Sequence, residues 1–173
     1  LALFYRSAGS LRPYFRRAAE LGMERPDCLA ELQAAGLAAE SVMLEATGGV
    51  NTHKGAVYAF GLVLAAAGSR LVWGGDLFEA AAALAAAGGP PQRDTHGGLA
   101  RVRYGAGGAR CEALAGFPHA RRAWEALSRQ GAYAALLTLL AEVEDTNLLH
   151  RGGAEGLAFV REQATEILAG PEA

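Results

Sequence analysis

The residues best suited to chemistry lie in one glycine-rich block, Thr-Gly-Gly-Val-Asn-Thr-His-Lys-Gly, at positions 47–55. Gly48 and Gly49 allow backbone conformations with positive φ and the close approach of a ligand. The block is not a Walker P-loop, because the four-residue spacer between glycines is absent and no Ser or Thr follows the lysine. An ordinary glycine turn before a helix accounts for the same spacing, so both interpretations stay open.

The apolar run 55–67 that follows this block predicts a buried helix. Asn51 and Thr52 are favoured N-cap residues for it, which places His53 and Lys54 in the first turn. Free N–H groups, the positive end of the helix dipole and a lysine together suit an anion, above all a phosphate.

Two further blocks place polar side chains among glycines, one within 95–118 that contains Arg110 and Glu112, the other at 144–153. Three of the four histidines lie in the three blocks, at positions 53, 96 and 150. They could join Asp145 or Glu112 in a metal site, but no two histidines have the i, i+3 or i, i+4 spacing that favours zinc. We therefore favour hydrogen bonding and charge neutralisation around phosphates.

Asp145, Thr146 and Asn147 supply three oxygen-bearing side chains in succession, which suits a hydrated Mg²⁺ or a ribose hydroxyl. We expect Glu142, Asp145 and Thr146 to share a face of a helix over 133–150. Arg110 and Arg151 each have two interpretations. The first is that the guanidinium clamps phosphate oxygens in pairs. The second is an ordinary structural contact, which for Arg151 would be an interaction with the dipole at a helix C-terminus.

These three blocks, in this order, resemble the triphosphoribosyl-dephospho-CoA synthase family, and the resemblance runs from about Leu3 to Phe159. It implies a transferase that moves the 5-triphosphoribosyl group of ATP to the 2′-hydroxyl of 3′-dephospho-CoA and releases adenine. The product would be the prosthetic-group precursor for the acyl carrier protein of malonate decarboxylase or citrate lyase. The stretch 155–159 looks slightly more like the malonate-decarboxylase branch.

The resemblance also suggests roles for the residues of the three blocks. Asp145 and Glu112 are the candidate catalytic residues, as base or as complement to a sugar cation, and Asp145 is the candidate metal ligand. Thr146 and Asn147 are assigned to the ribose or the metal shell. The candidates for ATP or triphosphate binding are Gly48, Gly49, Asn51, His53, Lys54, Arg110, His150 and Arg151. Magnesium would arrive as Mg-ATP, a downstream acyl carrier protein transferase would be a partner, and a homodimer is allowed.

The chain departs from the family pattern at its start. Family members usually begin further upstream, with a segment rich in Gly, His and Asp, whereas this sequence begins at Leu1. We expect an upstream segment to add acidic groups suited to a metal-bound triphosphate.

Two other functions remain as alternatives. One is a helical metal-dependent nucleotide phosphohydrolase, which would release nucleoside diphosphate and phosphate instead of adenine. The other is an inactive nucleotide- or CoA-binding helical protein, which would bind ATP or dephospho-CoA without releasing adenine.

Composition predicts one compact domain over residues 1–173, because 51% of the residues are hydrophobic and 20% are charged. The formal net charge of −2 gives no general attraction to nucleic acid or to an anionic membrane. Cys28 and Cys111 have neither zinc spacing nor a disulfide framework, so we expect reduced thiols in a cytoplasmic protein. The apolar run 55–68 is too short for a spanning helix of about 20 residues.

The sequence predicts an all-α helical bundle of about seven to eight helices, with functional residues in glycine-rich loops and at helix ends. Strand patterns are almost absent, and Gly and Pro separate segments of helical length. A helix is expected to begin after Asp76, where Glu79 completes a capping box. The other expected helices span 11–21, 26–35, 37–46, 52–67, 120–130, 133–150 and 154–169.

Overall fold

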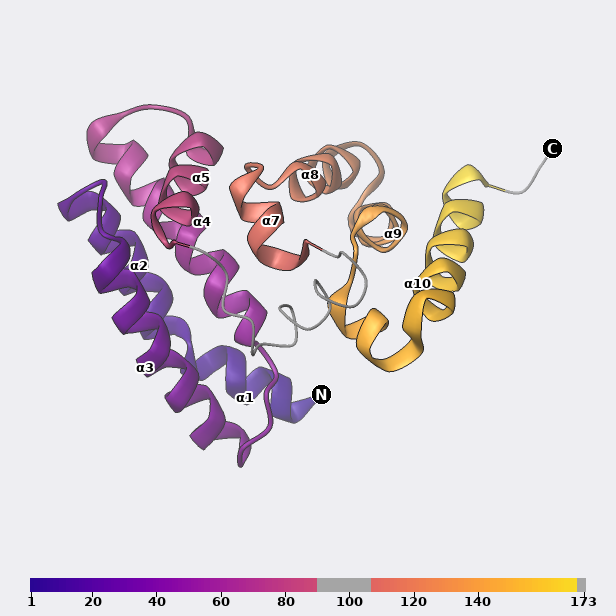
Figure 1. The fold of residues 1–173 in the computed structure, drawn as a ribbon, viewed down its shortest axis with the longest axis horizontal. Coiled ribbons are helices and arrows are strands. Elements are labelled where there is room, and N and C mark those ends of the chain that lie inside the picture. The colour runs from indigo at the N-terminus through magenta and orange to yellow at the C-terminus, as the bar shows by residue number, and fades with distance from the viewer. Residues whose placement is uncertain (90–106, 171–173) are drawn as a thin grey trace. The chain divides into compact units, whose positions relative to one another are not determined.

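The computed structural model describes residues 1–89 and 107–170, and every regular element in these ranges is an α-helix. The prediction of an all-α protein is confirmed (Figure 1). The chain divides into two compact units, Leu1–Gly89 and Pro90–Ala173, which we call unit 1 and unit 2. One domain over 1–173 stays a prediction.

Unit 1 is built around one long apolar helix, α4, which contacts α2, α3 and α5. Its helices are α1 (Ala2–Ser10), α2 (Arg12–Glu24), α3 (Leu29–Thr47), α4 (Lys54–Trp73) and α5 (Leu77–Ala87). The closest approach joins α2 and α4 through two glycines. A Cβ on Gly22 would lie 1.8 Å from the Ala65 carbonyl oxygen, and one on Gly68 would lie 1.9 Å from that of Ala19. The two helix backbones can therefore touch only because both positions lack a side chain.

Two glycines that we predicted to end helices pack inside them instead. The predicted helices 26–35 and 37–46 form the single helix α3, because Gly36 faces the Tyr14 hydroxyl, 3.4 Å from where a Cβ would stand. The helix predicted to stop at Gly68 continues to Trp73. By contrast, the helix predicted after Asp76 is confirmed as α5. Oδ1 of Asp76 accepts hydrogen bonds from the N–H groups of Phe78 and Glu79 in its first turn.

Helix α4 has 20 residues and a mean hydropathy of 1.6, so by length and composition alone it could cross a membrane. We expected this apolar stretch to be too short to span a membrane. That expectation was wrong, because it took Gly68 as the end of the helix. A buried core helix has the same composition. Val57, Leu62, Ala65 and Ala66 are at most 2% exposed within unit 1, so its packing accounts for the apolar character of this face.

Unit 2 contains α7 (Gly108–Leu114), α8 (Pro118–Gln130), α9 (Ala132–Glu142) and α10 (Thr146–Ala169). Helix α9 contacts both α8 and α10, and Gly131, with φ 91°, makes the turn between α8 and α9. The unit buries mostly small and aliphatic side chains: Ala113, Ala123, Ala134, Leu137, Leu149, Leu157 and Ala164.

The continuous helix predicted over 133–150 was wrong. The chain leaves the helical conformation at Val143 (φ −71°, ψ 135°) and enters α10 at Thr146. Asp145 competes with helix continuation, because its side chain caps the new helix. Glu142, Asp145 and Thr146 consequently do not share a helix face. The predicted break near Gly153 is present as a kink inside α10, where Gly153 has φ 64° and ψ −166°.

Candidate functional site

The glycine block of unit 1 forms the turn between α3 and α4. Gly48 and Gly49 have φ values of 65° and 87°, so the predicted positive φ is confirmed at both. The N–H of Gly48 donates to the Glu45 carbonyl at 3.3 Å, and that of Gly49 donates to the Leu44 carbonyl at 2.7 Å. Both donors therefore terminate α3 in the manner of a Schellman cap. Their contact with a phosphate stays a prediction.

The start of α4 is capped by an uncharged side chain. Oδ1 of Asn51 accepts from the Lys54 N–H at 3.2 Å, while His53 occupies the cap position and directs its own N–H to Met43 Sδ at 3.2 Å. Gly55 and Ala56 follow in the first turn, where no carbonyl one turn earlier is available inside the helix. This geometry retains the N–H groups and dipole that favour an anion.

Lys54 forms an ion pair with Glu40 of α3, with 3.0 Å between Nζ and Oε2. The Lys54 side chain is 56% exposed and that of Glu40 is 23% exposed, so solvent screens the pair in part. The Lys54 ammonium therefore remains accessible to an anion from solvent.

Tyr14 fixes α2 against this part of α4. Its hydroxyl donates to the Val57 carbonyl at 3.0 Å, and the residue is 8% exposed. Burial, with a smaller contribution from the negative charge of Glu40, raises the pKa of Tyr14 to about 12. The phenol is therefore neutral at physiological pH.

Sequence reasoning missed a polar cluster that joins α1 to the start of α4. Ser7 Oγ lies 2.6 Å from Thr52 Oγ1 and 2.8 Å from His53 Nδ1. Ser7 has 0% exposure. No sequence spacing links residues 45 positions apart, and a serine in an otherwise ordinary segment gives no signal of its own.

In unit 2, Glu112 organises the turn into α8. Its Oε1 accepts from the backbone N–H of His119 at 2.8 Å, and its Oε2 lies 2.5 Å from His119 Nδ1. Phe117, 6% exposed, adopts a left-handed conformation with φ 56° to bring the chain into this turn. The carboxylate we expected at the reaction centre thus also has a structural partner, His119, which lies outside the polar blocks and was not among the expected site residues.

The second and third polar blocks meet within unit 2. The N–H of Gly107 donates to Oε2 of Glu144 at 3.4 Å, and a Cβ on Gly108 would lie 3.3 Å from Thr146 Cγ2. The helix that carries Arg110 and Glu112 therefore begins beside the start of α10.

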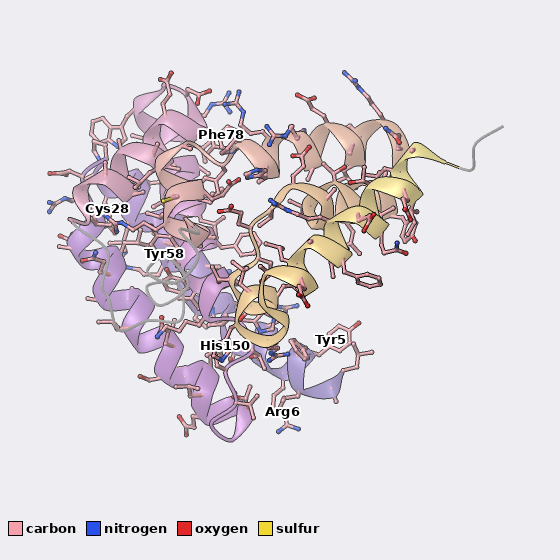
Figure 2. All side chains as sticks on the ribbon, turned by 45° about the vertical axis from the view of Figure 1, so that its right-hand side comes forward. Tyr5, Arg6, Cys28, Tyr58, Phe78 and His150 are labelled. Carbon is pink, nitrogen blue, oxygen red and sulfur yellow. The ribbon has the colours of Figure 1, made fainter. Side chains whose placement is uncertain are left out.

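Asp145 caps α10, because its Oδ1 accepts from the N–H groups of Asn147 at 2.7 Å and Leu148 at 3.2 Å. His150 and Arg151 follow one turn later on exposed positions of α10, before the kink (Figure 2 labels His150). Arg110 is partly buried on α7. Convergence of these residues with His53 and Lys54 would join the two units and stays a prediction, and His96 lies outside the described residues.

The residues described in 1–89 and 107–170 contain no group of three His, Cys, Asp or Glu side chains that could hold a metal. Oδ1 of Asp145 already accepts hydrogen bonds from α10, so Oδ2 is the carboxylate oxygen left to bind a magnesium ion. Mg²⁺ is commonly held by one or two carboxylates together with substrate phosphates. The described residues do not form a protein-built cage, and Asp145 as a ligand of an ion carried mainly by ATP stays a prediction.

Comparison with known proteins identifies relatives over the whole chain. The family model for ATP:dephospho-CoA triphosphoribosyl transferase matches residues 1–173. A 2-(5″-triphosphoribosyl)-3′-dephosphocoenzyme-A synthase of Pectobacterium atrosepticum is 36% identical over 197 aligned residues, which cover 99% of this chain and 65% of the relative. A probable synthase of the same name from Pseudomonas aeruginosa is 38% identical and covers 98% and 64%.

A synthase of that name from Klebsiella pneumoniae is 37% identical, over 97% of this chain and 65% of the relative. The chain thus spans just under two thirds of the length of the curated relatives it matches. No solved structure matches it.

Proposed function

The chain belongs to the ATP:dephospho-CoA triphosphoribosyl transferase family, and we propose that it takes part in the transfer of the 5-triphosphoribosyl group of ATP to the 2′-hydroxyl of 3′-dephospho-CoA. The glycosidic C–N bond of ATP breaks, a C–O bond forms, the hydroxyl proton passes to a base and adenine leaves. The triphosphate is retained, so the protein needs cations that hold phosphates without cleaving them.

The structural observation that carries this proposal is the start of α4. The uncharged Asn51 side chain, a first turn of helix N–H groups and the exposed Lys54 combine there, and Glu40 of α3 is the carboxylate that pairs with Lys54. We assign the triphosphate to this end of α4, with Asn51, His53 and Lys54 as its contacts. Gly48 and Gly49 would act by leaving room for the ligand.

The remaining contacts would come from unit 2. Breaking a glycosidic bond passes through a transition state with oxocarbenium character, which a carboxylate stabilises and which needs a base near the attacking hydroxyl. We assign these roles to Asp145 and Glu112, the ribose hydroxyls to Thr146 and Asn147, and further phosphate contacts to Arg110, His150 and Arg151. The contact of Gly107 with Glu144 supports the assignment, because it brings the α7 and α10 blocks together.

We propose further that magnesium enters with ATP and that the protein acts in the cytoplasm as a homodimer. The product would pass to an acyl carrier protein transferase serving malonate decarboxylase or citrate lyase, with the malonate branch favoured by residues 155–159. Size-exclusion chromatography with light scattering tests the dimer.

The deciding experiment incubates the chain with Mg-ATP and 3′-dephospho-CoA and separates the products by chromatography. Free adenine together with a triphosphoribosylated dephospho-CoA is the expected result. Nucleoside diphosphate and phosphate would instead identify a phosphohydrolase. Binding of ATP without release of adenine would mean that this chain binds nucleotide but lacks part of the catalytic machinery.

A further inference from the structure

Three polar side chains meet where α1 touches the start of α4, and we call them the Ser7 cluster. Ser7 Oγ lies 2.6 Å from Thr52 Oγ1 and 2.8 Å from His53 Nδ1, and Thr52 Oγ1 lies 3.2 Å from the same ring nitrogen. Ser7 is fully buried, while its neighbours Tyr5 and Arg6 extend outward from α1 (Figure 2). The buried serine therefore faces the imidazole from the inner side of the helix.

Two orders of donation fit the distances in the Ser7 cluster, and the number of hydrogens favours one of them. Each hydroxyl has one hydrogen to give. If Thr52 donates to Ser7 and Ser7 donates to His53 Nδ1, both hydrogens are used within the cluster. The opposite order, with Nδ1–H donating to Ser7 and Ser7 to Thr52, leaves the Thr52 hydrogen without an acceptor in the cluster. The first arrangement makes Nδ1 an acceptor, so the hydrogen of the neutral ring lies on Nε2.

A serine beside a histidine can also be a nucleophile with its base. Ser7 does not fit that role, because it has 0% exposure and no substrate atom could reach its hydroxyl. The hydroxyl instead holds the ring. The Phe4 ring meets the imidazole edge to face, with 5.6 Å between centroids and 75° between planes, and restricts the ring further.

We propose that Ser7 is a positioning residue for the nucleotide site, which with Thr52 keeps Nδ1 of His53 as an acceptor and so directs the hydrogen of the ring to Nε2. The inference rests on the proposed function, because it supplies the ligand that this donor meets. Nε2 lies on the far side of the ring from both hydroxyls, and His53 is partly exposed at the cap position of α4. A fixed N–H there adds one directed donor for a phosphate or ribose oxygen beside the helix N–H groups.

Nitrogen-15 NMR of the histidine ring tests the hydrogen assignment without any ligand. The full chain is compared with Ser7→Ala and with Ser10→Ala, and His53→Gln identifies the signals. Ser10 is the matched control, because its hydroxyl donates to the Ser7 carbonyl at 2.8 Å and not to the ring. At a pH where the ring is neutral, we expect one tautomer with hydrogen on Nε2 in the unaltered chain and in Ser10→Ala, and a mixture in Ser7→Ala. Hydrogen on Nδ1 in the unaltered chain, or unchanged ring signals in Ser7→Ala, would overturn the inference.

Calorimetric titration with Mg-ATP provides the second readout. Ser7→Ala should weaken binding about three- to tenfold, the usual consequence of losing one hydrogen bond, and Ser10→Ala should bind like the unaltered chain. Thr52→Val keeps the side-chain shape and removes the first donor, so its loss of affinity should be smaller than that of Ser7→Ala. This variant also provides the test if Ser7→Ala folds poorly. Equal affinities in all variants would overturn the positioning role. If the unaltered chain binds no Mg-ATP, the proposed function fails, while the tautomer result still decides what Ser7 does to the ring.

Discussion

Helices α4 and α10 begin in similar sequence contexts but differ in the charge of the cap. Each has a histidine and a cation near its start: His53 at the cap position and Lys54 as the first residue of α4, and His150 and Arg151 within the first two turns of α10. At α4 the side chain that accepts from the helix is the neutral amide of Asn51, two residues before the cap position, and it accepts one N–H. At α10 it is the carboxylate of Asp145, which accepts two.

This difference separates two kinds of helix start. A carboxylate at the N-cap supplies the negative charge that the helix dipole attracts, so α10 already has its anion. At the start of α4 the side chain that accepts from the helix is uncharged, and a negative charge reaches this end only from Glu40 of α3, through its ion pair with Lys54. This contrast supports our proposal that the triphosphate binds at α4 and that the carboxylates of unit 2 serve the sugar and the proton.

The largest expected effect concerns the support of α4. Gly68→Ala should destabilise unit 1 by about 2–3 kcal/mol or more, because the new Cβ would stand 1.9 Å from the Ala19 carbonyl oxygen and the two backbones would have to separate. Gly55→Ala is the matched control in the same helix. Nothing lies within 4 Å of its Cβ position, and replacing a helical glycine there should stabilise by about 0.5–1 kcal/mol. Urea unfolding followed by circular dichroism measures both, and equal stabilities would mean that α2 and α4 are not in backbone contact.

The next effect concerns the charge at the start of α4. Lys54→Ala should weaken Mg-ATP binding by about 1.5–3 kcal/mol, the value of one charge-assisted hydrogen bond. Arg122→Ala is the control, because this arginine pairs with Glu142 on the surface of unit 2 with 49% of its side chain exposed, and its loss should change binding little. Isothermal titration calorimetry compares the two. Equal losses would place the triphosphate elsewhere.

At α10 the two roles of Asp145 can be separated. Asp145→Ala removes the cap and should cost about 0.5–2 kcal/mol of stability, as should Asp76→Ala at the corresponding cap of α5. Asp145→Asn keeps a good cap and removes only the charge. If Asp145 serves the reaction, Asp145→Asn retains most of the stability yet loses adenine release, whereas a purely structural Asp145 would leave activity intact in this variant.

A smaller effect appears at alkaline pH. The pKa of Tyr14 is raised from 10.0 to about 12 by burial and by the charge of Glu40, so the folded state holds this proton more tightly than the unfolded state. Its contribution to stability is complete below pH 10 and is lost as the pH rises towards 12. Tyr14→Phe should cost about 1 kcal/mol at pH 7, through the lost hydrogen bond to Val57, and should flatten the pH dependence between 10 and 12. Unfolding of both proteins across this range provides the check, and parallel curves would refute the assignment.

Local patterns predicted the helical fold and the capping of α5, because a cap residue and its helix are neighbours in sequence. They failed at Gly36 and Gly68, because a glycine that admits a neighbouring helix has the same sequence signature as a glycine that ends one. They also failed at Asp145, where capping outweighed a continuous apolar pattern. For the site, sequence predicted the positive φ of Gly48 and Gly49. It was wrong about the cap position of α4, which His53 occupies in place of Asn51 or Thr52, although Asn51 accepts the Lys54 N–H from two residues further back. Ser7 and Glu40 could not be found this way, because they are distant in sequence from His53 and Lys54. Only the packing of α1 and α3 against the start of α4 brings these residues into contact.

The smallest effect is the most direct test of the contrast between the two helix starts. Asn51→Asp gives α4 the carboxylate that α10 already has, so unit 1 should gain about 0.3–1 kcal/mol of stability through the helix dipole. The same charge would repel a triphosphate at that end, so Mg-ATP should bind about two- to fivefold more weakly, the equivalent of that energy. Asp145→Asn makes the opposite exchange and should leave the affinity for ATP without Mg²⁺ unchanged, because the contact proposed between Asp145 and the bound nucleotide runs through the metal. Opposite changes in stability and affinity for Asn51→Asp would support an anion site at α4, because a merely structural cap would change stability alone. If Asp145→Asn altered the affinity for ATP without Mg²⁺ and Asn51→Asp did not, the triphosphate would belong at α10.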